Sequence, residues 1–311
     1  MRVHVLGSAA GGGFPQWNCN CRNCSGLRRG TIRATARTQS SIAVSADGER
    51  WYIANAGPDI RQQIERFAGL HPRRGARDTP IEAIVLTNAD VDHVAGLLSL
   101  RESQPVLIYA TETVRGWVCG SNAIFRVLTV APKQSRWEKI ELNYTEFAEP
   151  RPLIGLDGKA SGILFEAFAV PGKPPTYLGL QAGPDEATIG LRFIDERSGR
   201  SVAYVPGIKQ IDSRLEQIIR SCDCILFDGT CWSDDELIAQ DAGTKTALAM
   251  GHLPIGGPLG SLKNMARFAE QRRIYIHINN TNPILDEDSE QRREVEAAGW
   301  EIAFDGMDFD V

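Results

Sequence analysis

The chain has 311 residues, of which 42% are apolar and 23% are charged, and its formal net charge at pH 7 is −5. This composition is ordinary for a globular protein and gives no reason to expect a nucleic-acid partner, because phosphate binding needs clustered Lys and Arg. No segment approaches the roughly 20 apolar residues of a membrane span, and residues 1–7 are too short for a signal peptide, so we expect a cytoplasmic protein without membrane insertion.

Short apolar runs that end in polar residues or glycine predict alternating strands and helices. In the first half, strands are expected at 3–6, 40–44, 51–54 and 81–87, and helices at 60–67, capped by Asp59, and at 94–101. In the second half, strands are expected at 163–170, 188–193, 201–205, 224–227, 273–278 and 300–304, and helices at 211–220 and 259–270. No low-complexity linker separates the halves. We therefore expect one domain, residues 1–311, with an α/β fold of two packed sheets and helices outside.

Three of the seven cysteines, Cys19, Cys21 and Cys24, lie within six residues of one another. Thiolates this close repel one another unless a metal neutralises them, and an odd number of cysteines argues against a disulfide framework. The spacing therefore predicts a structural zinc site in a tight loop. Such a site needs a fourth ligand, and the candidates are His252 and Asn280. Ligand chemistry favours His252, because a neutral amide oxygen is a weak donor to zinc.

A second polar cluster begins where the strand 81–87 ends, in the sequence Asn-Ala-Asp-Val-Asp-His at residues 88–93. The carboxyl ends of strands are where ligands gather in α/β sheets. Asp228 follows another predicted strand, and the only five histidines of the chain include His252 and His277, which also lie at ends of elements. This placement favours a functional site over a purely structural role.

The cluster at 88–93 resembles the metallo-β-lactamase superfamily, whose members carry the pattern H-x-H-x-D-H at this strand-to-helix junction. Asn88 and Asp90 stand in place of the first two histidines. The middle histidine of the superfamily should fall near residues 170–173, where the chain has none. The superfamily ligands that remain are Asp92, His93, Asp228 and His277. The resemblance implies an αββα sandwich of two mixed sheets flanked by helices.

Four longer segments, 7–21, 35–41, 96–102 and 277–285, resemble the PqqB family, which belongs to the biosynthesis of the coenzyme pyrroloquinoline quinone (PQQ). A related phosphodiesterase of phosphonate metabolism also has a Cys-x-Cys-x-x-Cys knuckle. A histidine three residues after the last active-site histidine completes that knuckle. The same position is Asn280 here. The family comparison thus favours Asn280 as the fourth zinc ligand, whereas ligand chemistry favours His252.

The missing histidines change the chemistry that the resemblance implies. A complete site of the superfamily holds two metals, and hydrolysis of this kind needs both ions. This chain keeps only one set of ligands, so a lactamase or phosphodiesterase activity is disfavoured. Two histidines and a carboxylate form the facial triad of non-haem iron(II) oxygenases. The resemblance therefore implies hydroxylation of the tyrosine-derived ring in the cross-linked Glu-Tyr precursor of PQQ.

In this interpretation Asp92, His93 and His277 hold iron(II) or another divalent metal. Asp228 is expected to act as a fourth ligand or as the base for the phenol. His252 is expected to transfer a proton near the substrate. Asp90 is expected to orient the metal ligands from outside their first shell.

Two alternatives remain open from the sequence. In one, the protein is a non-catalytic carrier involved in transport of PQQ or its precursor. Arg37, Arg61 and Arg101 would then pair with the carboxylates of the ligand. In the other, the acidic and histidine cluster only stabilises the fold.

Overall fold

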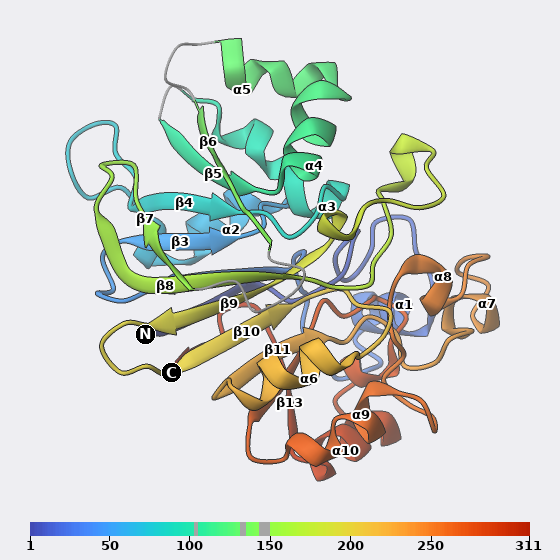
Figure 1. Cartoon of the computed structure of the whole chain (residues 1–311). Helices are drawn as coiled ribbons and strands as arrows, with labels where there is room; N and C mark the ends of the chain where they lie inside the picture. The colour runs from blue at the N-terminus through green and yellow to red at the C-terminus, as the bar shows by residue number, and fades with distance from the viewer. Residues whose placement is uncertain (103–104, 131–134, 143–149) are drawn as a thin grey trace.

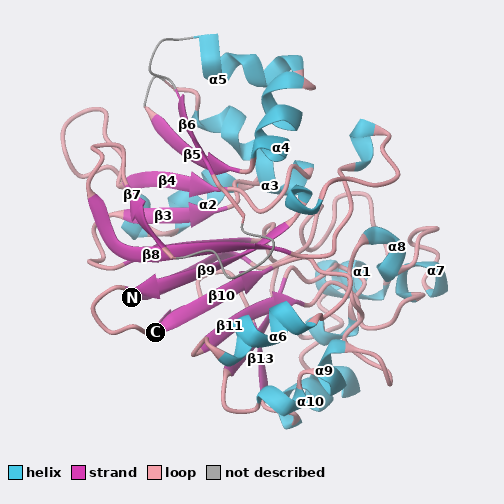
Figure 2. Ribbon diagram, viewed as in Figure 1, coloured by secondary structure: helices cyan, strands magenta, loops and turns pink. Residues whose placement is uncertain are grey.

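In a computed structural model, the chain forms two seven-stranded β-sheets that pack face to face, with helices on the outer faces (Figures 1 and 2). The structure describes residues 1–102, 105–130, 135–142 and 150–311. This architecture confirms the predicted αββα sandwich of two mixed sheets.

The first sheet is built mainly from the N-terminal half of the chain. Its strands, in spatial order, are β14 (Asp308–Asp310), β1 (Arg2–Gly7), β2 (Ser41–Ser45), β3 (Trp51–Ala54), β4 (Ile81–Val85), β5 (Val106–Ala110) and β6 (Ser135–Lys139). The strands from β14 to β3 pair antiparallel, and those from β3 to β6 pair parallel. The C-terminal β14 thus returns to the sheet of the opposite half.

The second sheet is built from the C-terminal half. Its strands, in spatial order, are β13 (Trp300–Ile302), β12 (Arg272–Ile276), β11 (Cys224–Asp228), β10 (Ser201–Val205), β9 (Ile189–Asp195), β8 (Ala160–Ala169) and β7 (Arg151–Ile154). The strands from β10 to β13 pair parallel, and those from β7 to β10 pair antiparallel. The parallel strands β11 and β12 therefore end at the same edge of this sheet.

The described helices are short and lie at the outer faces and at the strand ends. They are α1 (Arg22–Arg29), α2 (Ile60–Arg66), α3 (Val91–Val94), α4 (Glu112–Arg115), α5 (Val127–Val130), α6 (Ser213–Arg220), α7 (Glu236–Ala239), α8 (Ala247–Met250), α9 (Ser261–Asn264) and α10 (Glu290–Ala297). Apolar side chains of α2, α4 and α5 pack on the first sheet, and those of α6 and α10 pack on the second. Within the described residues, no helix combines the length and the apolar character that a bilayer crossing requires.

The helix predicted at 94–101 is different in the structure. It begins earlier, at Val91, and continues as a 3-10 helix over Ala95–Leu100. The Gly96 N–H donates to the carbonyl of Ala56, at 2.8 Å, instead of to its own helix. A tertiary hydrogen bond therefore competes with the α-helical pattern at this point.

Two further details also correct the sequence prediction. The helix expected at 259–270 is divided into α9 and a 3-10 turn, Ala266–Phe268. Asp59 precedes α2, but its carboxylate does not cap that helix. It accepts hydrogen bonds from the backbone N–H and the side-chain Nε2 of Gln39, both at 2.9 Å.

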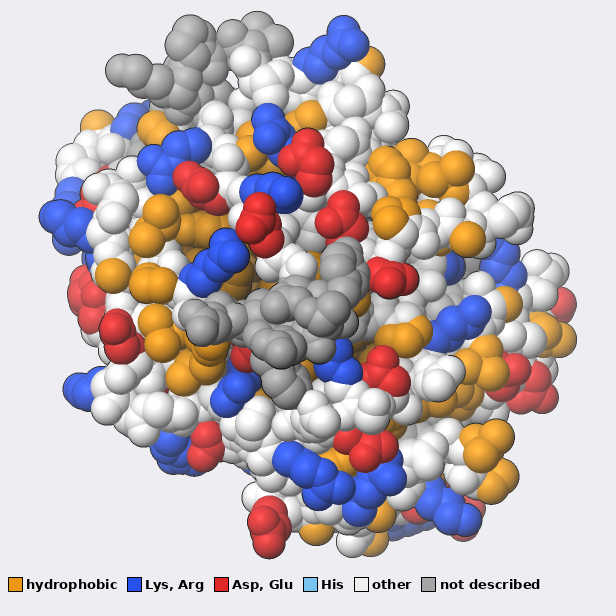
Figure 3. All heavy atoms as spheres, in the orientation of Figure 1, with side chains coloured by type: hydrophobic (Ala, Val, Ile, Leu, Met, Phe, Trp, Pro, Cys, Tyr) orange, Lys and Arg blue, Asp and Glu red, His pale blue; other side chains and the backbone are white. Residues whose placement is uncertain are grey.

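One hydrophobic core fills the space between the two sheets. It includes Val5 and Val85 from the first sheet and Phe193 and Leu226 from the second, all fully buried. This shared core supports the proposal that residues 1–311 form one domain. On the outer surface, acidic and basic side chains are intermixed on the face that Figure 3 shows.

Candidate metal centre

Three of the predicted metal ligands converge at the edge where strands of both sheets end. Asp92 and His93 lie in α3, after β4, and His277 directly follows β12. The Oδ2 atom of Asp92 lies 3.2 Å from Nε2 of His277 and 3.7 Å from Nε2 of His93. The two imidazole rings are 5.5 Å apart and nearly perpendicular. One ligand atom from each residue falls within 4.8 Å of the others, so the three side chains point to a common centre.

One direct observation supports metal binding by these three side chains. The Nε2 atom of His93 is buried and has no hydrogen-bond partner among the described residues. A buried polar atom is rarely left without a partner, because desolvation then goes uncompensated. A cation at the common centre of Asp92, His93 and His277 would satisfy this nitrogen.

The electrostatics of the centre also favour a cation. Burial lowers the pKa of His93 to about 4, so this imidazole is neutral near pH 7. Burial opposes ionisation of Asp92, but the imidazoles of His93 and His277 hold the pKa of its carboxyl well below its usual range. Burial would lower the pKa of His277, but its hydrogen bond to Asp92 outweighs burial and raises it. A metal at this centre would therefore compete with the proton that the His277 imidazole shares with Asp92.

A second cluster shares His277 and contains Asp228 and His252. The His252 Nδ1 atom lies 2.8 Å from Oδ2 of Asp228, and the His252 and His277 rings stack at 5.2 Å. Asp228, at the end of β11, is fully buried and also accepts hydrogen bonds from the Ile208 N–H and from the N–H and Oγ1 of Thr230. Both oxygens of this carboxylate are thus occupied by protein donors.

Two threonines that no sequence motif singles out contact the Nδ1 atoms of the histidines. Thr230 Oγ1 lies 2.8 Å from Nδ1 of His277, and Thr87 Oγ1 lies 3.1 Å from Nδ1 of His93. If each Nδ1 carries the ring proton, it donates a hydrogen bond to the threonine hydroxyl. Each Nε2 then keeps a lone pair that can coordinate a metal. The only sequence signal is that both threonines stand at strand ends next to the acidic motifs.

Asp90 was expected to orient the ligands. Within the described part of the chain, its carboxylate accepts no hydrogen bond, so the threonines make the orienting contacts instead. Asp90 faces the cavity above the centre. Burial and the charge of Asp92 raise the pKa of Asp90 to about 6.

Changing Thr87 to valine should weaken metal binding at this centre by about 10–100-fold, as is typical when a metal-bound histidine loses its outer partner. Valine keeps the shape of the side chain but cannot accept the Nδ1 proton of His93. Competition between the protein and a chelator for Zn²⁺ measures the effect. Thr129→Val, at an exposed position in α5, is the matched control. Equal affinities of both variants would mean that Thr87 does not orient His93.

The centre opens into a cavity of about 220 Å³. Asp92, His93, His252 and His277 line this cavity, and its other polar residues include Asn88, Asp90, Lys173 and Asn279. Lys173 lies in the segment where the superfamily would place its middle histidine, so a cationic amine occupies that side of the cavity.

The three arginines considered for a carrier do not line this cavity. Arg37 is buried elsewhere, where its guanidinium donates to the Ser8 hydroxyl and the Ala303 carbonyl. Arg61 is exposed on α2, and Arg101 is exposed beside Glu102. The prediction that these residues bind substrate carboxylates is therefore wrong for this cavity.

The three cysteine sulfurs also converge, each within 4.8 Å of the others. Part of the expected loop is helical, because Cys21 is the N-cap of α1 and Cys24 lies in its first turn. The amide of Asn280 faces all three, with Nδ2 3.1, 3.6 and 3.4 Å from Sγ of Cys19, Cys21 and Cys24. His252 lies in the Asp228 cluster instead. The structure thus places Asn280, and not His252, at the knuckle.

The thiols at the knuckle already share protons unequally. A hydrogen bond from Cys24 lowers the pKa of Cys21 to about 5, and the same bond raises the pKa of Cys24. One thiolate therefore exists at neutral pH without a metal, and a cation would favour deprotonation of the others.

Comparison with known proteins agrees with this geometry. Residues 50–278 match a model described as a beta-lactamase superfamily domain. Coenzyme PQQ synthesis protein B of Pseudomonas putida (strain GB-1) is 46% identical, and 100% of each chain is covered. The protein of the same name from Methylobacterium nodulans is 47% identical over 99% of each chain. This chain belongs to the PqqB family.

Solved structures give the same result at the level of the fold. The crystal structure of Zn²⁺-bound PqqB from Methylobacterium extorquens is 45% identical, covers 100% of both chains and superposes with a TM-score of 0.90. A diphosphatase from the PhnP family has a TM-score of 0.66 at 20% identity, with 100% of this chain and 97% of that one covered. The second likeness shows the fold alone. The first is a structure of a PqqB protein with zinc bound.

Proposed function

We propose that this protein acts in PQQ biosynthesis as an iron(II)-dependent hydroxylase of the tyrosine-derived ring in the cross-linked Glu-Tyr precursor. The observation that supports this proposal is the convergence of Asp92, His93 and His277 beside an open cavity. Two imidazoles and one carboxylate are the donors of non-haem iron(II) oxygenases. The names of the relatives support the pathway, since both are called coenzyme PQQ synthesis protein B.

The proposed reaction converts an aromatic C–H bond into C–OH. It consumes one dioxygen, two electrons and two protons, and it releases one water. Iron(II) held by Asp92, His93 and His277 would supply the activation of dioxygen, and an external two-electron reductant would supply the electrons. One oxygen atom of dioxygen is thus found in the product ring and the other in water.

The chain's own residues provide the proton acceptor for the ring hydroxyl. His252 lines the cavity, and its Nδ1 is held by Asp228 at 2.8 Å. This contact leaves Nε2 of His252 available to take the phenolic proton. Because Asp228 is buried and occupied by four donors, it acts through His252 rather than on the substrate. Loss of the proton makes the ring more electron-rich and easier to oxidise.

A carrier of PQQ or its precursor is the second candidate. The specific observation in its favour is that Asn88, Asp90 and Lys173 occupy the side of the cavity where the superfamily binds its other metal. Their presence also argues against hydrolysis by two metals. A carrier would hold its ligand without needing His93 or His277 for turnover.

A second metal is proposed at the knuckle, where Cys19, Cys21, Cys24 and Asn280 would hold a structural zinc. With the side-chain amide turned by 180°, Oδ1 of Asn280 takes the position facing the sulfurs. We also propose a cytoplasmic location. All seven cysteines are unpaired, which suits a reducing compartment.

Anaerobic loading with iron(II), followed by ¹⁸O₂, a reductant and the cross-linked precursor, tests the hydroxylase. We expect mass spectrometry to find one ¹⁸O atom in the ring with the iron-loaded protein and none with the zinc-loaded protein. Tight precursor binding without any oxygen incorporation would contradict the hydroxylase and favour the carrier.

A further inference from the structure

Two of the three knuckle cysteines, Cys21 and Cys24, have the spacing and the placement of a redox-active dithiol. We propose that hydrogen peroxide oxidises this pair to a disulfide and thereby releases the knuckle zinc, which makes the knuckle a reversible, peroxide-sensitive site. The dithiol does not depend on the proposed hydroxylation. The zinc that it releases rests on the metal site proposed above for the knuckle.

The first support is the way in which α1 begins. The sequence Cys-Arg-Asn-Cys at residues 21–24 has the Cys-x-x-Cys spacing of thiol–disulfide exchange sites. Cys21 is the N-cap of α1 and Cys24 lies in its first turn, so both thiols lie at the same end of the helix. The backbone N–H of Cys24 donates to Sγ of Cys21 at 3.5 Å, and the two thiols share a hydrogen bond. The two sulfurs therefore lie side by side in the reduced protein.

The two thiols also differ in exposure, as a two-step oxidation requires. Cys24 is fully buried, whereas Cys21 is half-buried and lines a cavity of about 550 Å³. Oxidation of a cysteine depends on its exposure and its thiolate character, and zinc keeps the coordinating sulfurs as thiolates. Cys21 is thus the sulfur that peroxide reaches first. Cys24, which contacts it from the buried side, is the resolving sulfur.

The oxidation balances with hydrogen peroxide alone. The Cys21 sulfur attacks one oxygen of the peroxide, so an S–O bond forms, the O–O bond breaks and one water leaves. The Cys24 sulfur then attacks the Cys21 sulfur, so an S–S bond forms, the S–O bond breaks and a second water leaves. In total, two thiols and one peroxide give one disulfide and two waters. Zinc binds thiolates, so it loses two donors and dissociates.

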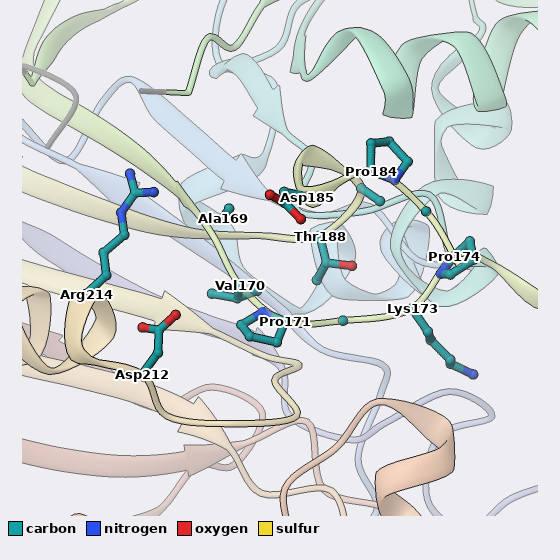
Figure 4. Close-up of a pocket in the computed structure, with 13 residues that line it drawn as sticks. Ala169, Val170, Pro171, Lys173, Pro174, Pro184, Asp185, Thr188, Asp212 and Arg214 are labelled. Carbon is teal, nitrogen blue, oxygen red and sulfur yellow. The ribbon is translucent and has the colours of Figure 1, made fainter. Parts of the chain in front are cut away.

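The knuckle cavity adjoins the metal cavity, which gives peroxide a short route. Gly11, Met250 and Asn279 line both cavities, and a Cβ atom added at Gly11 would lie 3.3 Å from Oδ2 of Asp92. Dioxygen that takes two electrons and two protons from the same reductant, without attack on the ring, becomes hydrogen peroxide. The metal cavity also shares Lys173 with a cavity of about 440 Å³, whose described lining residues include no cysteine (Figure 4). Peroxide that leaves the centre therefore meets thiols on the knuckle side.

Treatment of the zinc-loaded, iron-free, full-length protein with hydrogen peroxide tests the proposal. Trypsin cleaves after Arg22 and separates peptide 3–22, which holds Cys19 and Cys21, from peptide 23–28, which holds Cys24. After alkylation of the remaining thiols, we expect mass spectrometry to find these two peptides cross-linked, with the alkyl group on Cys19. A zinc-binding dye should report zinc release at the same rate. Dithiothreitol and zinc should restore the starting protein by thiol–disulfide exchange.

Two variants separate the dithiol from general oxidation. Cys24→Ser should stop the reaction at a sulfenic acid on Cys21, which dimedone traps, and this covalent product forms whether or not the variant holds zinc. Cys119→Ser, which removes a half-buried thiol outside the knuckle, should release zinc as the wild type does.

Three results would overturn the dithiol. One is a cross-link within peptide 3–22 alone, the second is an alkyl group on Cys21, and the third is a knuckle that stays reduced while Cys119 is oxidised. Formation of the predicted disulfide in protein whose knuckle never held zinc would support the dithiol and overturn the proposed zinc instead. Because the peroxide is added, a failure of the hydroxylase leaves the result of this test unchanged.

Discussion

Replacing His277 with asparagine should remove both iron binding at the active centre and ring hydroxylation, while the cysteine knuckle keeps its zinc. His277 is the one residue that belongs to both clusters of candidate ligands. It also has a backbone φ of 61°, where asparagine is much better tolerated than most residues. His277→Asn thus deletes the imidazole without adding the backbone strain that alanine would bring.

The effect should exceed the ~10–100-fold loss that accompanies removal of an outer partner, because a direct ligand is lost. Metal analysis after anaerobic loading, together with ¹⁸O incorporation, measures both parts of the prediction. His71→Asn is the matched control, since His71 lies outside both clusters and its ring, among the described residues, forms a hydrogen bond with the Glu65 carbonyl alone. A His277→Asn protein that still binds iron and hydroxylates the ring would show that the reaction takes place elsewhere.

The sequence predicted which candidate ligands lie close together better than it predicted the bounds of the surrounding helices. The strand at 51–54 and the strands that lead to Asp92, Asp228 and His277 follow from short apolar runs that end in polar residues. Buried parallel strands need continuous apolar sequence, so such runs can be recognised as strands before the fold is known. The convergence of residues as distant as Asp92 and His277 then follows from the shared edge of strand ends.

Other features depend on contacts that no local pattern encodes. The orienting roles of Thr87 and Thr230 depend on their hydroxyl groups. Nothing in the sequence distinguishes these two residues from other threonines at strand ends. Lys173 faces the metal cavity only because the loop after β8 returns to α8 and Gly251. The same limit applies to the fourth position of the knuckle. Donor strength alone favoured His252, but the fold engages that imidazole with Asp228, and the Asn280 amide faces the sulfurs.

Removal of zinc from the knuckle should destabilise the protein by several kcal/mol. The apparent binding free energy of structural zinc in small peptides, about 10–16 kcal/mol, sets an upper limit. The knuckle joins α1 to the loop after β12, since Asn23 Nδ2 donates to the carbonyls of Asn280 and Asn282 at 3.1 and 2.8 Å. Cys21→Ser should lower the urea midpoint as strongly as chelation does. Cys119→Ser, outside the knuckle, should change it little.

Two substitutions at Asn280 separate a metal-binding role from a packing role. Asn280→His adds a stronger zinc donor at the same place and should hold zinc at least as tightly as the wild type. Asn280→Leu fills the space without a donor and should lose zinc. Because Asn280 lies three residues after His277, the loss should also displace that imidazole and weaken iron binding. Zinc retention in Asn280→Leu would mean that another group completes the knuckle, and intact iron binding in zinc-free protein would mean that the two centres are independent.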